Sequence, residues 1–370
     1  MSKIFLFFII LYFVFIGILT SDKNFNLADY SNKDLGINGY ISSEVVSKNG
    51  KIEFTINKTL VSFYSKEELF YGDYVKLNCE NFSAPKKYLQ VKGVKYICNK
   101  PKILNIEKNK KQDFYYYLFK LKYFIKDRIS KIYASPYNGL IFGVLFGGNY
   151  LDKDLSNLFS KAGISHIIAV SGYNISIIIS IFSVILLKIG FNRFKIFYFL
   201  LFFLFSFVLF TGATASVIRA TVMGFCSLLA LQFGRISSNV FSLFFVGFIM
   251  VLFNPLLLVY DVGFQLSFLA TFGILFLTPI LDNIFIKFGD FLSIKESLTT
   301  TISAFIFTCP IIFMNFGSFN LLSIIVNLLV LQYIPFLMLF GFVSIFIPKI
   351  IPVLAILIMK YIIFVCGVFS

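Results

Sequence analysis

Tryptophan is absent from the 370 residues, and histidine occurs once, as His166. The five cysteines form no Cys-x-x-Cys pair and no cluster with histidine, so the common zinc sites of proteins are excluded. We therefore expect neither a metal nor a cofactor. Phenylalanine and lysine are abundant instead, a skew that AT-rich coding produces by itself, so their counts carry no functional argument.

Charged residues are also scarce. They make up 14% of the chain against 58% hydrophobic residues, and several apolar runs approach the roughly 20 residues that cross a bilayer as a helix. The sequence therefore predicts a polytopic α-helical membrane protein. Acidic residues are outnumbered 18 to 33 by lysine and arginine, which gives a net charge of +15. Such a chain attracts anionic lipid headgroups or a polyanion such as DNA, and charge does not choose between them.

The first apolar run, residues 4–19, follows Lys3 and has no Ala-x-Ala cleavage site. We expect residues 1–20 to be a retained transmembrane anchor, with a cleaved signal peptide as the alternative.

Residues 21–105 are polar and rich in β-forming residues. The stretches KIEFTINKTLVSFY and YGDYVKLNCE alternate in hydrophobicity, and Asn49-Gly50 and Gly72-Asp73 are turn signals. The size and strand spacing fit a small OB-like β-barrel, a fold that binds single-stranded nucleic acid. A folded spacer is the alternative.

Residues 106–135 contain a predicted basic amphipathic helix. Apolar side chains recur at helical spacing through FYYYLFKLKYFIKDRISKI, residues 114–132, and most charges lie off that stripe. Such a helix lies in the membrane interface, although a linker helix packed on the protein has the same periodicity. The stripe consists of Phe114, Tyr117, Leu118, Leu121, Phe124, Ile125 and Ile132.

Residues 136–370 carry the remaining apolar runs and predict a multi-pass membrane domain. Basic residues recur in the short loops after alternate crossings, which the positive-inside rule assigns to the cytoplasm. These residues are Arg193, Lys195, Arg235, Lys287, Lys295 and Lys349. The runs are 167–190, 196–211, 213–233, 240–260, 262–281, 299–315, 321–347 and 350–369.

The same rule orients the β domain. With Lys3 in the cytoplasm, a retained first helix places residues 21–105 on the external side. Cys79 and Cys98 then meet an oxidising environment, and we predict a disulfide between them.

Four clusters of polar residues interrupt the apolar runs. The first consists of Ser165, His166, Ser171, Gly172 and Asn174. Gly172 relaxes the backbone, and a broken or re-entrant helix is tolerated only where it is buried in protein or lines water. A histidine satisfied at the membrane interface is the alternative. A serine hydrolase is disfavoured, because roughly 140° of helical rotation separates His166 from Ser171.

The second cluster is TGATASVIRATVMG, residues 211–224, in which Thr211 and small residues surround Arg219. Small residues let helices approach closely. The guanidinium keeps its charge, so it needs a carboxylate, carbonyl, phosphate or water as a partner. We therefore expect Arg219 to face a water-filled path.

The third cluster is NPLLLVYDVGFQLSFLATFG, residues 254–273, where Asp261, Gln265 and Ser267 follow a helix-breaking Asn-Pro. Asp261 and Gln265 are four residues apart and share a helical face. We expect Asp261 to pair with Arg219, with a helix-capping aspartate as the alternative. The fourth cluster, residues 315–320 with Asn327, indicates an external turn.

Taken together, these stretches resemble the membrane core of the ComEC family, the DNA-uptake channel of natural competence. The resemblance covers about residues 105–345, in family order, and YGDYVKLNCE is similar to a strand of the family's OB-like domain. The stretches are LIFGVLFGG (140–148), LSNLFSKAGISHIIAVSGYNISI (155–177), LFTGATASVIRATVMG (209–224), NPLLLVYDVGFQLSFLATFGILF (254–276) and NFGSFNLLSIIVNLL (315–329).

The resemblance implies a channel that moves single-stranded DNA across the bacterial cytoplasmic (inner) membrane during natural transformation. The expected partners are single-stranded DNA, membrane lipid, an external DNA receptor, a separate nuclease, a cytoplasmic DNA-translocating ATPase and further copies of the chain as a homo-oligomer. The DNA pathway would be lined by Ser165, His166, Ser171, Gly172, Asn174, Thr211, Arg219, Asp261 and Gln265.

The sequence departs from the family pattern at two places. Tyr173-Asn174 stands where many relatives have Leu-His, and Asn149 stands where they have an acidic residue. Long relatives carry a metallo-β-lactamase-like nuclease domain, and one histidine does not supply its HxHxDH motif. We therefore expect the chain not to be an enzyme. The alternative function is a transporter for small anions or lipids that uses the intramembrane arginine.

Overall fold

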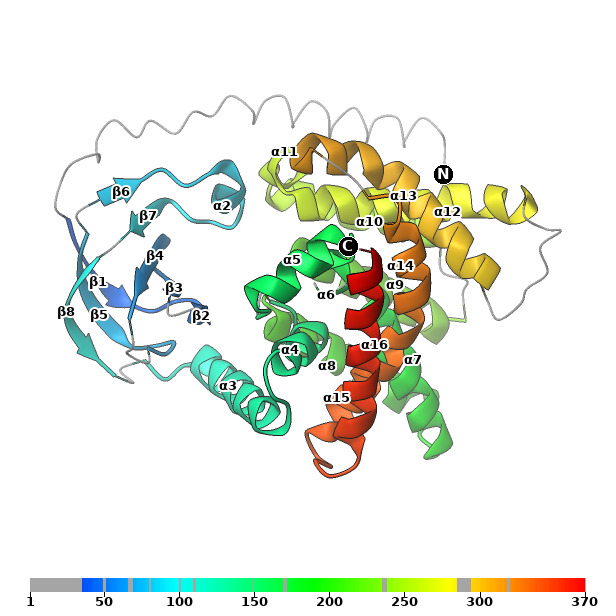
Figure 1. Cartoon of the computed structure of the whole chain (residues 1–370), viewed down its shortest axis with the longest axis horizontal. Coiled ribbons are helices and arrows are strands. Elements are labelled where there is room, and N and C mark those ends of the chain that lie inside the picture. Colours follow the sequence, from blue (N-terminus) through cyan, green and yellow to red (C-terminus); the bar gives the residue numbers. More distant parts are fainter. Residues whose placement is uncertain are drawn as a thin grey trace. The chain divides into compact units, whose positions relative to one another are not determined.

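The computed structural model describes residues 35–369 except 49–50, 66–68, 80, 100, 109–110, 149, 169–171, 235–237, 285–293 and 318–319 (Figure 1). The expected anchor at residues 1–20 lies outside this part, as do Ser171, Arg235 and Lys287. The chain forms two compact units. The β unit comprises Met1–Phe124 and Phe253–Asp261, and the helical unit comprises Ile125–Leu252 and Val262–Ser370.

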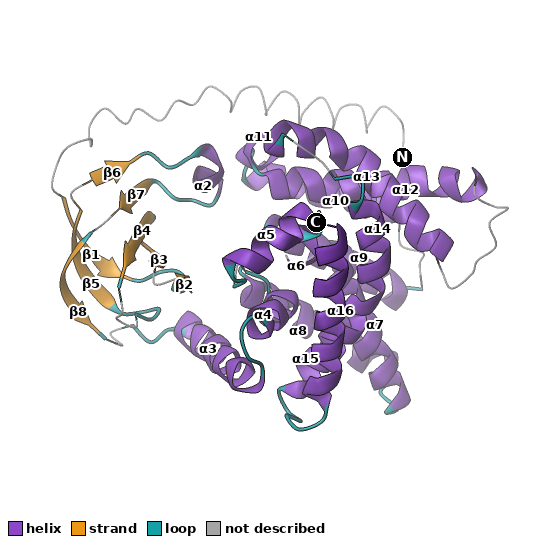
Figure 2. Cartoon of the chain, viewed as in Figure 1, coloured by secondary structure: helices purple, strands orange, loops and turns teal. Residues whose placement is uncertain are grey.

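The β unit contains two sheets (Figure 2). One has three strands in the order β1-β5-β8 and the other has five in the order β2-β3-β4-β7-β6. All pairs are antiparallel except β4 and β7. The strands are β1 (Leu35–Tyr40), β2 (Val46–Lys48), β3 (Lys51–Ile56), β4 (Thr59–Tyr64), β5 (Tyr74–Cys79), β6 (Asn81–Ser83), β7 (Tyr96–Asn99) and β8 (Lys102–Glu107).

Alternating hydrophobicity builds the core of this unit. Along β3, Ile52, Phe54 and Ile56 are buried while their neighbours are partly exposed, as period-2 geometry requires. The predicted small β domain is thereby confirmed. Cys79 and Cys98 are fully buried and joined by a disulfide with their Cα atoms 5.9 Å apart, which links β5 of one sheet to β7 of the other.

A second part of the chain packs on the β unit. The short helices α2 (Lys87–Val91) and α11 (Leu256–Tyr260) are in contact. The Lys87 ammonium donates a hydrogen bond to the Tyr260 hydroxyl at 2.8 Å, and Asn254 Nδ2 donates to the Val91 carbonyl at 3.0 Å. The sequence did not predict this contact.

Helix α3 (Phe114–Ile132) has the bounds expected for the amphipathic helix. Phe114, Tyr117, Leu121 and Phe124 of the predicted stripe are exposed, whereas Leu118 is buried. The Lys122 ammonium is buried and pairs with the Glu44 carboxylate at 2.7 Å. The helix is therefore held by a buried ion pair on one side and keeps an exposed apolar face on another.

The described part of the helical unit consists almost entirely of helices (Figure 1). They are α4 (Tyr137–Phe146), α5 (Lys153–Lys161), α6 (Ser165–Ile168), α7 (Gly172–Lys188), α8 (Arg193–Thr211), α9 (Ala215–Gln232), α10 (Asn239–Phe253), α12 (Val262–Ile284), α13 (Ile294–Phe316), α14 (Ser323–Val330), the 3-10 helix η2 (Leu331–Tyr333), α15 (Ile334–Ser344) and α16 (Ile351–Phe369).

Six segments of the described chain are long and apolar enough to cross a membrane, so the prediction of a polytopic helical membrane protein is confirmed. They are Arg193–Thr211, Ala215–Gln232, Val262–Ile284, Lys295–Asn315, Ser323–Ser344 and Ile351–Phe369. Two other predicted runs form shorter apolar helices. The run at 240–260 forms α10, which ends at Phe253 before Asn254-Pro255, and the run at 167–190 forms α7.

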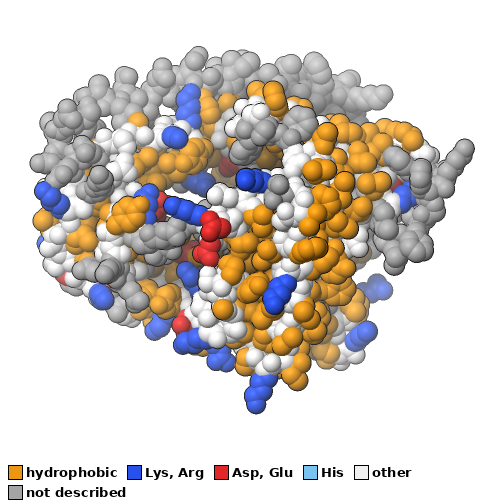
Figure 3. Space-filling view, viewed as in Figure 1, with side chains coloured by type: hydrophobic (Ala, Val, Ile, Leu, Met, Phe, Trp, Pro, Cys, Tyr) orange, Lys and Arg blue, Asp and Glu red, His pale blue; other side chains and the backbone are white. Residues whose placement is uncertain are grey.

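Hydrophobic side chains cover much of the outer surface of the helical unit (Figure 3). Phe202, Phe205 and Phe364 are each at least 65% exposed. Exposing so many apolar side chains to water is unfavourable, whereas contact with lipid tails is favourable. Inside, one core joins α4, α5, α14, α15 and α16, and a second joins α7, α8 and α9.

Candidate functional site

Arg219 lies within the membrane-spanning helix α9 and is only 8% exposed. Its Nε donates a hydrogen bond to Ser267 Oγ of α12 at 2.8 Å, and its Nη1 contacts Met223 Sδ at 3.5 Å. The guanidinium carbon lies 6.0 Å from the centroid of the Phe268 ring. The charge is thus held by a hydroxyl, a thioether and an aromatic face.

Within the described part of the helical unit, no carboxylate forms an ion pair with Arg219. A buried charge usually pairs with an opposite charge, because the unpaired ion is expensive to desolvate. The partners that Arg219 does have are neutral. The site therefore retains a positive charge that an anion can neutralise.

Gly172 brings the first turn of α7 next to this arginine. A Cβ atom on Gly172 would lie 3.0 Å from Arg219 Nη2 and 3.2 Å from Ala220 Cβ. Glycine is therefore the residue that allows this close approach. Three of the predicted polar clusters meet here, since Gly172, Arg219 and Ser267 come from the first, second and third.

The buried guanidinium gives this place a positive potential. Because its partners among the described residues are neutral, the electrostatics of the site suit phosphate or carboxylate.

Two predicted pathway residues are buried in helices of the same unit. Asn174 of α7 is 1% exposed. Thr211 ends α8, and its hydroxyl donates to the Phe207 and Val208 carbonyls of its own helix at 2.9 and 3.3 Å. The Thr211 hydroxyl is therefore hydrogen-bonded within the last turn of its own helix.

Ser165 and His166 are exposed on the short helix α6. The loop before them is tied to the fourth polar cluster, because Asn320 Nδ2 donates to the Lys161 carbonyl at 2.9 Å. Gly163, whose φ is +73°, leaves no room for a side chain, since a Cβ would lie 2.5 Å from Ser323 Cβ. The first and fourth clusters are therefore neighbours.

Asp261 and Gln265 flank the start of α12, with Asp261 at the end of α11. Asp261 belongs to the β unit and Arg219 to the helical unit, so their expected pairing stays a prediction. Ser267, which the sequence placed beside these residues, is the one that contacts Arg219.

Among the residues that the structure describes, no three His, Cys, Asp or Glu side chains are grouped as metal ligands.

Comparison with known proteins places these residues in a family. The Competence family of competence proteins matches residues 144–370, which is more than half of the chain. The chain belongs to this competence protein family. The matched region contains Gly172, Arg219 and Ser267.

A relative from Bacillus subtilis (strain 168), ComE operon protein 3, is 26% identical over 236 residues. The match covers 63% of this chain and 29% of that protein, so the chain spans less than a third of its relative's length. No solved structure matches the chain.

Proposed function

We propose that this competence-family protein conducts single-stranded DNA through the cytoplasmic (inner) membrane, with Arg219 as a phosphate contact on the path. The observation that carries the proposal is the buried guanidinium beside Gly172 of α7, whose partners among the described residues are neutral. Every phosphate of the strand carries a charge that does not cross hydrocarbon unaided.

Transport needs binding that is favourable and reversible. A conducting site must attract the ion strongly enough to admit it and weakly enough to release it. Arg219 offers one positive charge, and the Ser267 hydroxyl that accepts its hydrogen bond can be exchanged for a phosphate oxygen without breaking an ion pair. This combination favours a moving polyanion over a permanently bound one.

The remaining predicted residues take supporting roles in this proposal. The path near a broken or re-entrant helix would be lined or shaped by Ser165, His166, Ser171, Asn174, Thr211, Asp261 and Gln265. His166 can contact phosphate or organise a gate, because an imidazole donates hydrogen bonds in either protonation state.

The β unit is proposed to be an external OB-like domain that aligns the strand. Its exposed lysines and aromatic side chains suit a sequence-tolerant strand binder. The exposed apolar face of α3 would lie in the lipid interface. An external DNA receptor and a separate nuclease would supply the strand, a cytoplasmic ATPase would give direction, and a homo-oligomer is the proposed assembly.

The test is uptake of labelled DNA by competent cells that carry or lack this gene. Internalised DNA and DNA bound to the outer surface are scored separately. Loss of internalisation with normal surface binding, restored by the gene in trans, supports the proposal. Unchanged internalisation in the deletion strain contradicts it.

A transporter for small anions or lipids is the second candidate. The same buried arginine favours it, because one guanidinium does not distinguish a short anion from a long one. Uptake of labelled phosphate, small carboxylates and phospholipid in vesicles containing the purified protein separates the two functions.

A further inference from the structure

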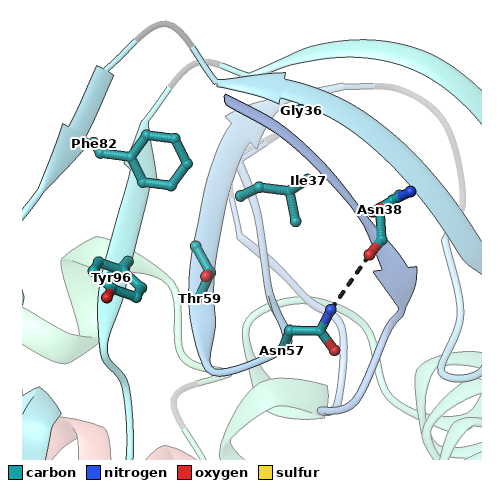
Figure 4. Close-up of a pocket in the computed structure, with 7 residues that line it drawn as sticks. All are labelled: Gly36, Ile37, Asn38, Asn57, Thr59, Phe82 and Tyr96. Carbon is teal, nitrogen blue, oxygen red and sulfur yellow. Dashed lines mark hydrogen bonds between the residues drawn. The ribbon is translucent and has the colours of Figure 1, made fainter. Parts of the chain in front are cut away.

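The β unit contains a pocket of about 270 Å³ that is lined by strands of both sheets (Figure 4). Ile37 of β1 forms one wall, and Phe82 of β6 and Tyr96 of β7 form the other. Asn57 and Thr59 also line the pocket, with Thr59 between Tyr96 and Ile37 (Figure 4). The pocket is below the roughly 300 Å³ of the smallest usual ligand sites, so it accommodates one ring system.

The aromatic wall suits a flat ligand. The Phe82 and Tyr96 ring centroids are 6.4 Å apart, and the ring planes are nearly perpendicular at 89°. Phe82 and Ile37 point toward one another across the pocket (Figure 4). A planar ring can therefore stack on one aromatic face and meet the edge of the other, which is the favoured geometry of aromatic groups.

Polar groups border the aromatic wall. Asn57 Nδ2 donates to the Asn38 carbonyl at 3.3 Å, which fixes the amide beside the pocket. An amide carries both donors and an acceptor, so it can pair with the edge of any base.

Two lysines lie at the starts of two neighbouring strands. Thr59 and Tyr96 are register partners of the parallel β4–β7 pair, and the preceding residues, Lys58 and Lys95, are both exposed. The Lys95 amide donates to the Lys58 carbonyl at 2.8 Å, which holds the two backbones together. Lys58 and Lys95 do not line the pocket, but each directly precedes a lining residue along the chain. Cations that flank a stacking site can hold the phosphates of a strand whose base is stacked there.

We propose that this pocket holds one base of a single-stranded nucleic acid, with Lys58 and Lys95 contacting the adjacent phosphates. This inference rests on the proposed function for its ligand class. Stacking is tolerant of sequence because every base has a π-face. The pocket would therefore hold any base of an incoming strand while the lysines follow its backbone.

The test uses the full chain in lipid nanodiscs and a fluorescent oligothymidine of twelve nucleotides. An abasic strand of the same length is the comparison, because it keeps the phosphates and removes the bases. We expect the wild type to bind oligothymidine at least about fivefold more tightly than the abasic strand. Tyr96→Ala should abolish this preference, and Tyr96→Phe, which keeps a ring, should retain it.

A second variant changes the opposite wall of the pocket. Ile37 points toward Phe82 across the pocket (Figure 4), so Ile37→Ala removes the apolar group that faces the aromatic wall. Ile37→Ala should therefore lower the preference for bases as Tyr96→Ala does. Tyr64→Ala is the matched control, since Tyr64 is 77% exposed and does not line the pocket.

Lysine variants separate the two kinds of contact. Lys58→Gln with Lys95→Gln should weaken binding of both strands equally and flatten its salt dependence. Equal wild-type affinity for the two strands would overturn the proposal, as would unchanged discrimination in both Tyr96→Ala and Ile37→Ala. The two proposals can fail separately. If a strain that lacks the gene takes up DNA normally, the proposed function is rejected. If the purified protein still shows base-dependent binding that Tyr96→Ala removes, the inference that the pocket binds a base stands.

Discussion

Arg219 is a buried charged residue within a candidate membrane-spanning helix. The guanidinium is buried and bonded to neutral groups, whereas structural arginines in proteins are usually paired with carboxylates. A purely structural role would be served as well by a neutral residue of similar volume. In the proposed function, this charge contacts an anion that visits the site.

The close approach of Gly172 leads to a prediction about transport. Gly172→Ala places a methyl group 3.0 Å from the position of Arg219 Nη2, so the guanidinium must shift. We expect DNA internalisation to fall while protein abundance stays normal. Gly367→Ala is the control, since a Cβ there meets nothing within 4 Å. Equal internalisation in the two variants would show that the position of Arg219 is unimportant.

Part of this site could be predicted from the sequence. Arg219 stands out because a charge among small residues in an apolar run is unusual. Its partner Ser267 could not be selected, because 48 residues separate the two and a hydroxyl near Asp261 and Gln265 has no sequence signature of its own. The contact depends on how α9 and α12 pack.

At the scale of elements, α3 is anchored at its first turn by Asp113. The Tyr116 amide donates to Asp113 Oδ1 at 3.0 Å, and the Tyr71 hydroxyl donates to Oδ2 at 3.1 Å. Burial raises the pKa of Asp113, but hydrogen bonds from Lys111, the Tyr116 amide and Tyr71 outweigh it and hold this pKa below its usual value. Burial, followed by the Asp113 hydrogen bond, raises the pKa of Tyr71 to about 12.

This cap predicts a pH-dependent stability. A carboxyl whose folded pKa is depressed stabilises the protein fully above its unfolded pKa of about 3.9, and the contribution disappears as the pH falls through the folded pKa. Asp113→Ala should destabilise the protein by about 1 kcal/mol at pH 7. The difference from wild type should shrink below about pH 4.

The measurement is thermal unfolding in detergent at pH 7 and pH 3. Asp113→Asn is the matched variant, because asparagine caps helices as well as aspartate does and carries no charge. A difference between wild type and Asp113→Ala that is the same at both pH values would contradict the assigned role of the carboxylate.

Helix periodicity predicted the bounds of α3, since its stripe is regular and Pro136 follows it closely. The run at 240–260 was harder to divide. Its hydropathy is that of one continuous apolar segment. In the structure, however, Asn254 donates a hydrogen bond to the Val91 carbonyl, and Tyr260 accepts one from Lys87. These contacts join Phe253–Asp261 to the β unit, and contacts between distant segments leave no periodic signal in the sequence.

At the scale of the whole molecule, the composition divides a β-forming part from an apolar part, and the structure has a unit for each. Hydrophobic content predicted the multiple spans because lipid selects for it directly. The pairing of the strands into two sheets depends on long-range register and was not predictable from alternation alone.

The disulfide provides a prediction about the external placement of the β unit. In protein isolated without reductant and unfolded in detergent, maleimide should label Cys226, Cys309 and Cys366, which are free in the structure. Cys79 and Cys98 should react only after reduction. Labelling of all five cysteines without reduction would contradict both the bond and the oxidising compartment.

The most direct test of the central claim measures internalised DNA in cells that express Arg219→Gln at wild-type abundance. Loss of a charged hydrogen-bond donor should lower internalisation by about tenfold or more, with surface binding unchanged. Arg193→Gln is the control, since Arg193 is exposed at the start of α8, and it should transport normally. Wild-type internalisation by Arg219→Gln would contradict the claim that this buried charge contacts the strand.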